Sequence, residues 1–210
     1  MSVRRRFPAA PALLLLGAMA VAPAAVPPAG AQDIGLQLEE IRTLVREKRY
    51  PLALESLRLV ARQIQDLRLE AIAPAFPEPP SGWTATTPLS LQDEGDVWTG
   101  RLVAQRSYTP AAGTARLDLV IDLNSPHAPA AALALSPLVL AADPAIRARE
   151  IGGQQARVRF VPDTGEGEVR VLVGGATLVT ARGRGIESAE ALVRLVERVD
   201  FAFLRAAAGI

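Results

Sequence analysis

The hydrophobic pattern of this chain changes its period once, at the proline-rich segment PEPPSGW, residues 77–83. Before this segment apolar residues recur every three or four positions, as in helices, and after it they alternate, as in strands. Prolines cannot continue a helix, and Trp83 can bury a large apolar area. We therefore expect residues 74–83 to be a stiff linker docked by Gly82 and Trp83, joining two parts of an α+β protein.

Residues 32–73 predict an antiparallel helical hairpin. Pro51 suits the first turn of a new helix and disfavours helix at Tyr50, so the break falls at residues 48–51. The apolar stripe of the first helix comprises Ile34, Leu38, Ile41 and Val45, and that of the second comprises Leu54, Leu57, Ala61, Ile64 and Leu67.

The hairpin also resembles one helix pair of a tetratricopeptide repeat over residues 46–64, where an aromatic residue near the turn precedes an Ala-Leu helix. The chain has no second copy at the repeat spacing, and a lone repeat cannot bury its own face. We expect the hairpin to pack on its own domain or on a second copy of the chain, the latter giving a homodimer.

Residues 84–210 predict an antiparallel sheet of about six strands with helices over one face. The clearest strand, residues 114–124, places Leu117, Leu119 and Ile121 on one side and charged residues on the other. Further strands are expected at residues 97–108, 145–151, 155–161 and 168–173. Gly174 and Gly175 predict a two-residue turn that pairs Val171 with Leu178.

Helices are expected at two places in this second part. Residues 128–142 are rich in Ala and Leu but contain Pro137, which favours two short pieces or a kinked helix. A last helix is expected from about residue 188 to 207, with Ser188 as its N-cap and an inner stripe that includes Leu192, Val196 and Phe203.

The N-terminus has the order of a secretory signal peptide, residues 1–31. Arg4, Arg5 and Arg6 precede an apolar run, and Ala29-Gly30-Ala31 predicts cleavage after Ala31. The arginines partly match the twin-arginine export pattern, but the residue before them favours ordinary export. We expect a periplasmic or secreted protein, with no membrane anchor after cleavage.

The amino-acid composition excludes several kinds of reactive site and one class of partner. The chain has no cysteine, which excludes thiol nucleophiles, disulfides and a lipid-modified cysteine at the cleavage site. Loss of the three signal arginines leaves 20 basic and 22 acidic residues, a net charge of −2. This charge predicts no nucleic-acid partner.

Three patterns are candidates for reactive sites. Asp163-Thr164-Gly165 is the triplet of aspartic proteases, but a single copy needs a homodimer and the segment reads as a hairpin turn. His127, the only histidine, lies in a loop, where a solvated side chain is the ordinary interpretation. Residues 183–188 resemble a phosphate loop, but no parallel βαβ unit can follow. We therefore expect no catalytic, cofactor-binding or metal-binding residues and no cofactor.

Charged residues on the outer sheet face are expected to form surface ion pairs. Asp118 and Asp122 could pair with Arg157 or Arg159 across neighbouring strands.

The hairpin, the Pro-Pro-Ser-Gly-Trp joint, the Ile-Gly-Gly turn and the Val-Gly-Gly turn resemble a group of secreted bacterial proteins of uncharacterised activity. The sheet with its terminal helix resembles the Mog1/PsbP-like fold, which implies an accessory or binding role. From export and the lack of reactive motifs we expect a soluble, non-catalytic periplasmic accessory protein that binds a protein or envelope partner. The alternatives are a carrier of a small apolar ligand under residues 128–142 and a homodimeric hydrolase using Asp163.

Overall fold

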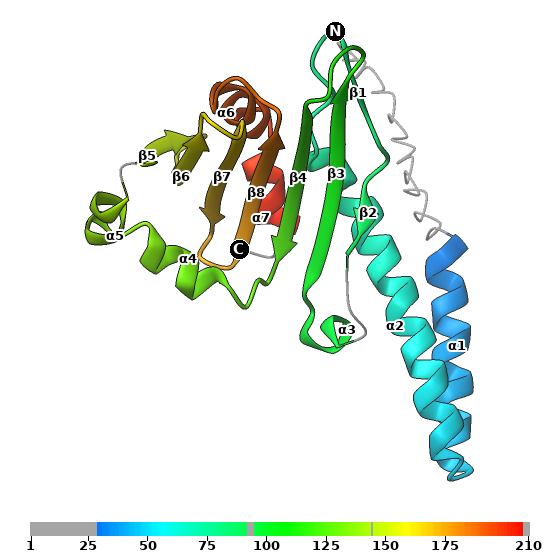
Figure 1. Cartoon of the computed structure of the whole chain (residues 1–210). Coiled ribbons are helices and arrows are strands. Elements are labelled where there is room, and N and C mark those ends of the chain that lie inside the picture. Colours follow the sequence, from blue (N-terminus) through cyan, green and yellow to red (C-terminus); the bar gives the residue numbers. More distant parts are fainter. Residues whose placement is uncertain (1–28, 92–94, 144, 208–210) are drawn as a thin grey trace, which may run out of the picture.

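The computed structural model describes residues 29–91, 95–143 and 145–207. These residues form an α+β fold in which a helical hairpin precedes an antiparallel sheet (Figure 1). The signal-peptide prediction for residues 1–28 lies outside the described residues. Cleavage after Ala31 would remove the first three residues of the first helix, which begins at Ala29.

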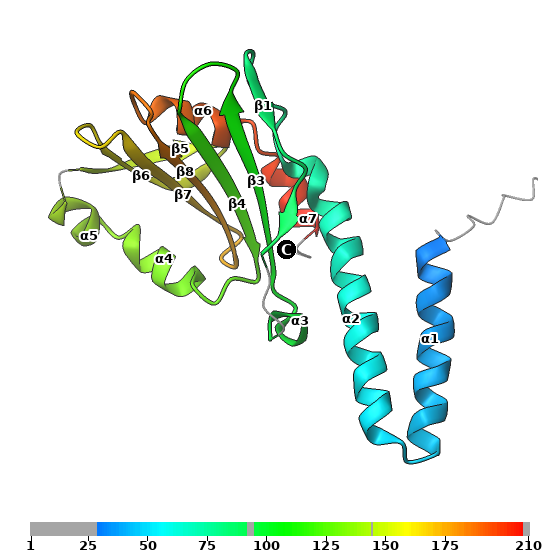
Figure 2. The same cartoon turned by 45° about the vertical axis from the view of Figure 1, so that its right-hand side comes forward.

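The hairpin consists of α1 (Ala29–Arg46) and α2 (Tyr50–Ile72). Pro51 lies in the first turn of α2, where its missing N–H is not needed. The two helices pack through a small cluster of their own: Ile41, Leu44, Ala53 and Val60, with Ile34 and Leu57 at its margin. Figure 2 shows the hairpin extending well past the edge of the sheet.

The last turns of α2 belong to the sheet's core. Ile72, 2% exposed, is part of the main hydrophobic cluster, and Leu69 packs against it. The short 3-10 helix η1 (Ala73–Ala75) follows and adds Ala75 and Phe76 to the same cluster. The hairpin is therefore continuous with the core at its root and free of it at its tip.

The described residues form an eight-stranded sheet in which every pairing is antiparallel, with the order β1-β3-β4-β8-β7-β6-β5 and β2 on the edge of β3. The strands are β1 (Trp83–Ala85), β2 (Leu89–Ser90), β3 (Leu102–Pro110), β4 (Arg116–Leu123), β5 (Ile146–Ile151), β6 (Gln154–Val161), β7 (Glu166–Val173) and β8 (Thr177–Arg184). The remaining helices are α3 (Asp96–Thr99), α4 (Ala128–Ala134), α5 (Pro137–Ala142), α6 (Glu190–Glu197) and α7 (Phe201–Ala207).

One face of the sheet packs against α6, α7 and the end of α2. The close approach of α6 depends on two glycines that face each other, Gly167 in β7 and Gly183 in β8. A Cβ at Gly183 would lie 2.7 Å from the Cδ1 of Ile186, and one at Gly167 would lie 2.9 Å from that of Leu192. Larger residues at these positions would require the side chains of Ile186 and Leu192 to shift.

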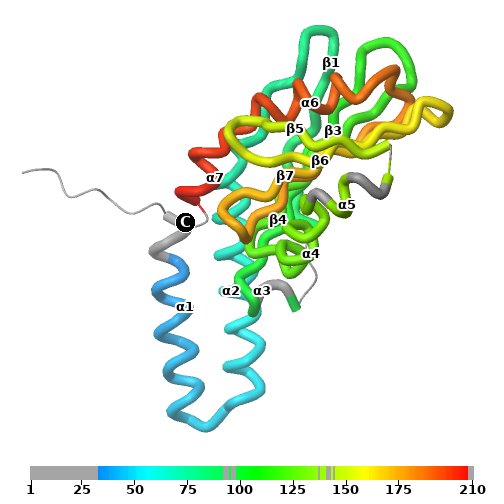
Figure 3. The backbone as a smooth tube through the Cα atoms, turned by 90° about the vertical axis from the view of Figure 1, so that its left-hand side faces the viewer, coloured from blue at the N-terminus to red at the C-terminus, as the bar shows by residue number. Residues whose placement is uncertain are grey.

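The opposite face carries polar and charged side chains and is partly covered by α4 and α5. Figure 3 shows the strands between α7 on one side and α4 with α5 on the other. Helices therefore lie on both faces, which corrects the expectation of helices over one face only. Pro137 does separate two short helices, as expected.

The predicted α+β class and antiparallel sheet are confirmed, with further corrections in detail. The sheet has eight strands in place of about six, because two short strands, β1 and β2, pair with the outer edge of β3. The predicted strand at residues 97–108 begins only at Leu102, since α3 precedes it.

Two local predictions at the C-terminal side were also wrong. Val171 pairs with Val179 and Val173 with Thr177, so the turn is one residue longer than expected and Leu178 lies on the polar face. The final helix is two helices, α6 and α7, and α6 has Ala189 as its N-cap with no side-chain capping bond, in place of Ser188.

Candidate functional site

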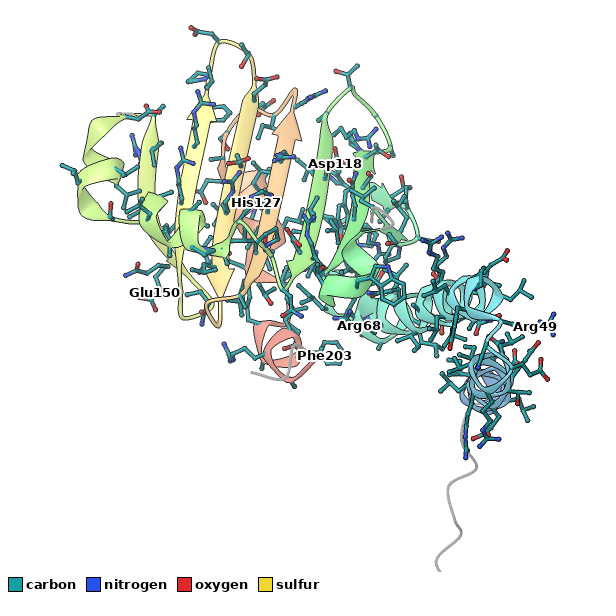
Figure 4. All side chains as sticks on the ribbon, turned by 90° about the horizontal axis from the view of Figure 1, so that it is seen from below. Arg49, Arg68, Asp118, His127, Glu150 and Phe203 are labelled. Atoms are coloured by element: carbon teal, nitrogen blue, oxygen red, sulfur yellow. The ribbon has the colours of Figure 1, made fainter. Side chains whose placement is uncertain are left out.

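The residues considered for catalysis lie apart from one another. Asp163 is exposed in the turn between β6 and β7, and Gly165 closes that turn through a 3.3 Å bond from its N–H to the carbonyl of Pro162. His127 is exposed just before α4 and lies apart from Asp118 of β4 (Figure 4). The segment at 183–188 leads from β8 to α6. Nothing in the described geometry joins these groups into one reactive centre.

The same described residues carry no metal-binding cluster and no membrane-spanning helix. No group of three or more His, Asp or Glu side chains in residues 29–91, 95–143 and 145–207 could hold a metal ion. Within those ranges, no helix combines the length and the apolar character that crossing a membrane requires.

The root of the hairpin is fixed to the sheet by polar contacts. The Gln65 amide donates to the carbonyl of Arg101 at 3.3 Å, and the Arg68 guanidinium donates to the carbonyl of Gly100 at 3.0 Å. Burial lowers the pKa of Arg68 from its ordinary value. The Asn124 amide donates to the same Gly100 carbonyl at 3.1 Å. The start of β3 and the end of β4 are thus held against α2, and Figure 4 shows Arg68 at this junction and Arg49 at the far tip of the hairpin.

Asp122 of β4 makes a second set of polar contacts. Its carboxylate accepts two hydrogen bonds from Arg101, at 2.8 and 3.0 Å, and one from the Ser125 hydroxyl at 2.7 Å. The side chains of Arg101 and Asp122 are only 21% and 10% exposed. Such a two-pronged pair is geometrically specific and holds the loop before α4 to the start of β3.

Large apolar side chains remain exposed on the hairpin. We call the following set the hairpin surface: Leu36, Leu38, Val45, Tyr50, Leu52, Leu54, Leu59, Ile64 and Leu67, each between 37% and 73% exposed.

On α2 one stripe of positions changes its environment along the helix. Residues 54, 61, 65, 68 and 72 share one side because they are spaced by seven, four, three and four. Gln65 and Ile72 are buried against the sheet, whereas Leu54 is 57% exposed. Beside this stripe lies α3, which contacts α2 and carries Trp98, 59% exposed. The side of α2 that packs on the sheet therefore continues beyond the sheet as an uncovered apolar surface.

The exposed apolar side chains were not recognised from the sequence as a surface. Leu38, Val45, Leu54, Ile64 and Leu67 were expected on the inner stripes, but all are more than a third exposed. The inner contacts are made by Leu44, Ala53 and Val60 in their place. The predicted helical periodicity is correct. However, two packed helices bury only part of the apolar residues in the hairpin, and the others stay exposed.

The polar sheet face also differs from expectation. Asp118 accepts hydrogen bonds from Arg116, Gln105 and Ser107, and Asp122 pairs with Arg101. Neither carboxylate contacts Arg157 or Arg159, because β8 and β7 lie between β4 and β6.

Comparison with known protein families, with curated proteins and with solved structures gave no match. The resemblances drawn from the turns and joints of the sequence therefore stay predictions.

Proposed function

We propose that this protein is an exported, non-catalytic accessory protein that binds an apolar helical segment of a partner protein through the hairpin surface. The observation that carries the proposal is the uncovered continuation of the α2 stripe at Leu54. The helix α3, which carries the exposed Trp98, contacts the same α2. Export is proposed from the signal-like sequence of residues 1–31 alone.

Two properties of the hairpin fit a helical apolar partner. Exposed apolar residues also recur at a spacing of seven on both helices, at Leu38 and Val45 and, on the side of α2 away from Leu54, at Leu52 and Leu59. Apolar residues at this spacing can anchor one helix against another. Residues 29–72 contain seven acidic and seven basic side chains, so the net charge of the hairpin is zero. With no net charge to attract a partner from a distance, apolar contact must supply the affinity.

The root of the hairpin supports a binding role in a second way. Gln65 and Arg68 hold α2 to the start of β3, and Ile72 is embedded in the core. A binding surface attached in this way is held in one orientation, which reduces the conformational entropy lost on association. Trp98 lies on α3, which contacts α2, and has the character of an interface anchor, because tryptophans often contribute strongly to binding.

The proposal can be tested by site-specific crosslinking in the periplasm of the source organism. A photo-reactive amino acid is placed at position 54, on the hairpin surface, and in a separate protein at position 138, where Leu138 is 83% exposed on α5. We expect one defined crosslinked protein from position 54 and none from position 138. The change Ala61→Asp, on the same stripe of α2 and combined with the crosslinker at 54, should abolish that product, whereas Leu138→Asp should leave it.

Three outcomes would count against the proposal. A product of the same mass from both positions would mean non-specific contact, and a product insensitive to Ala61→Asp would remove the α2 stripe from the interaction. A product consisting of two copies of this chain, with light scattering showing a dimer, would replace the accessory role by self-association.

A further inference from the structure

The segment α4–α5 creates a set of adjoining spaces on the polar face of the sheet. Leu135, between the two helices, lines all three. One is an open cleft of about 560 Å³, bordered by Ala132, Gln155 and Leu172, and another of about 480 Å³ is bordered by Leu140, Ala148 and Gln155. These volumes fall within the range of small-molecule sites.

The third space is much smaller and lies over two arginines. It measures about 10 Å³ and is lined by Ala131, Ala134, Leu135, Leu172, Arg157 and Arg170. A volume of this size admits about one water molecule or one ligand oxygen.

Arg157 of β6 and Arg170 of β7 are direct cross-strand partners, so two cations stand side by side under α4. The Nη2 of Arg170 donates to Glu168 at 3.0 Å, but the same Glu168 oxygen also accepts from Arg182 at 3.2 Å. The Arg157 side chain makes no hydrogen bond or ion pair to the described residues. The Glu168 carboxylate is thus shared by Arg170 and Arg182, and it does not reach Arg157.

The Nε atoms of both Arg157 and Arg170 are buried without an acceptor. A buried donor without a partner is costly, and a charged one more so. An oxygen atom placed in the small space between them would satisfy both groups. Since two like charges face each other there, an anionic oxygen is favoured over a neutral one.

We propose that the space under α4–α5 binds a fatty acid. One carboxylate oxygen occupies the small space at Arg157 and Arg170, and the hydrocarbon chain follows the apolar border formed by Leu135, Leu140 and Ala148. The planar fork of an arginine suits a carboxylate. A phosphate ester is disfavoured, because the small space holds only one oxygen.

This site is separate from the hairpin surface, so each proposal can fail without the other. The experiment uses the purified full chain after delipidation and isothermal titration with dodecanoate, below the concentration at which it forms micelles. Dodecanol has the same tail without the charge, and acetate has the charge without the tail. We expect one dodecanoate per chain, binding at least tenfold tighter than dodecanol, and no measurable heat with acetate.

Variants then locate the head group. Arg157→Gln should weaken dodecanoate binding by roughly ten- to a hundredfold, the range expected for losing a hydrogen-bonded charge. Arg182→Gln is the matched control, because Arg182 lies on the same sheet face, is 62% exposed and already pairs with Glu168. Leu140→Asp should weaken dodecanoate and dodecanol alike. Circular dichroism confirms that each variant is folded.

The proposal would be overturned by equal binding of dodecanoate and dodecanol, by many molecules bound per chain, or by equal effects of Arg157→Gln and Arg182→Gln. It would also be overturned if the unaltered chain bound no dodecanoate, which would leave a structural water as the occupant of the small space. Because this first comparison uses the unaltered chain, it does not depend on any variant folding.

Discussion

The hydroxyl of Tyr108, near the end of β3, donates a 2.9 Å hydrogen bond to the carbonyl of Pro77 in the proline-rich linker. The Arg106 guanidinium donates to the same carbonyl at 3.1 Å and lies 5.7 Å from the centre of the Tyr108 ring. Trp83 packs on the core at the far end of the linker. The PEPPSGW segment is therefore fixed along β3 at both ends, so that α2 enters the sheet at a set angle.

Replacing Tyr108 by Phe should lower the free energy of unfolding by about 1 kcal/mol, because one buried hydrogen bond is lost while Arg106 still satisfies Pro77. Burial raises the pKa of Tyr108 to about 12. Since an unfolded tyrosine has a pKa of about 10, this residue stabilises the fold fully below pH ~10 and loses that contribution as pH rises through about 12.

Urea unfolding at a series of alkaline pH values, in a Tyr50→Phe background, measures this effect. The Tyr108→Phe variant should show a shallower alkaline loss of stability than the chain that keeps Tyr108. Parallel curves would mean that ionisation of Tyr108 is not coupled to unfolding.

The stability contributed by Asp118 should be lost at low pH, whereas that contributed by Tyr108 is lost at high pH. Burial raises its pKa, but hydrogen bonds from Arg116 and Ser107 outweigh burial, and the pKa lies below its ordinary value. The group therefore contributes stability above the unfolded pKa of about 3.9 and loses it as pH falls through the native value. Asp118→Asn should cost about 1 kcal/mol at pH 7 and flatten the acid limb of a stability curve.

The matched control for this change is Asp163→Asn. Asp163 is exposed on the turn between β6 and β7, so its replacement should leave both the stability at pH 7 and the acid limb unchanged. Equal effects of the two changes, measured by urea midpoints from acid to neutral pH, would contradict a specific role for Asp118.

The turn between β5 and β6 offers a test at two adjacent glycines. Gly152 and Gly153 both have positive φ, at 56° and 73°. A Cβ on Gly152 would lie 2.6 Å from the ring of Phe201 in α7, whereas one on Gly153 would meet nothing within 4 Å. Asn tolerates this backbone conformation, so Gly153→Asn should cost under about 1 kcal/mol. Gly152→Asn should cost about 2 kcal/mol more, because it overlaps a buried ring.

Thermal or urea unfolding of the two variants gives the difference directly. Combining Gly152→Asn with Phe201→Ala should recover part of the loss, since the overlap is removed. If both Asn variants lost the same stability, backbone strain alone would explain the turn, and contact with α7 would be irrelevant.

Local pattern predicted much of the sheet because strand alternation and tight turns are short-range properties. Leu117, Leu119 and Ile121 are all at most 1% exposed, as the alternation predicts. Gly152 and Gly153 form the predicted tight turn, because Ile151 pairs with Gln154. The break in the last helix was missed because its apolar spacing continues across it. Asp200 accepts a 2.8 Å hydrogen bond from the backbone N–H of Phe203, a capping signal that the sequence does contain.

The binding surfaces could not be predicted in the same way, because they depend on contacts between distant segments. Nothing local distinguishes Leu54, which is exposed, from Ile72, which is buried on the same stripe of α2. The opposition of Arg157 and Arg170 follows from the register of β6 and β7, which is set by the length of the turn between them.

The difference between the root and the tip of the hairpin leads to the last prediction. Ile72→Ala should lower the free energy of unfolding by about 3 kcal/mol, because Ile72 is 2% exposed within the main core. Leu54→Ala should change it by less than about 0.5 kcal/mol, because Leu54 is 57% exposed. Ile41→Ala, in the hairpin's own cluster, should fall between the two.

Urea unfolding followed by far-ultraviolet circular dichroism measures all three variants. A single transition shifted by Ile72→Ala would show that the root of α2 and the sheet unfold together. If Leu54→Ala destabilised the chain as much as Ile72→Ala, Leu54 would be a core residue, and the hairpin surface would no longer be available to a partner.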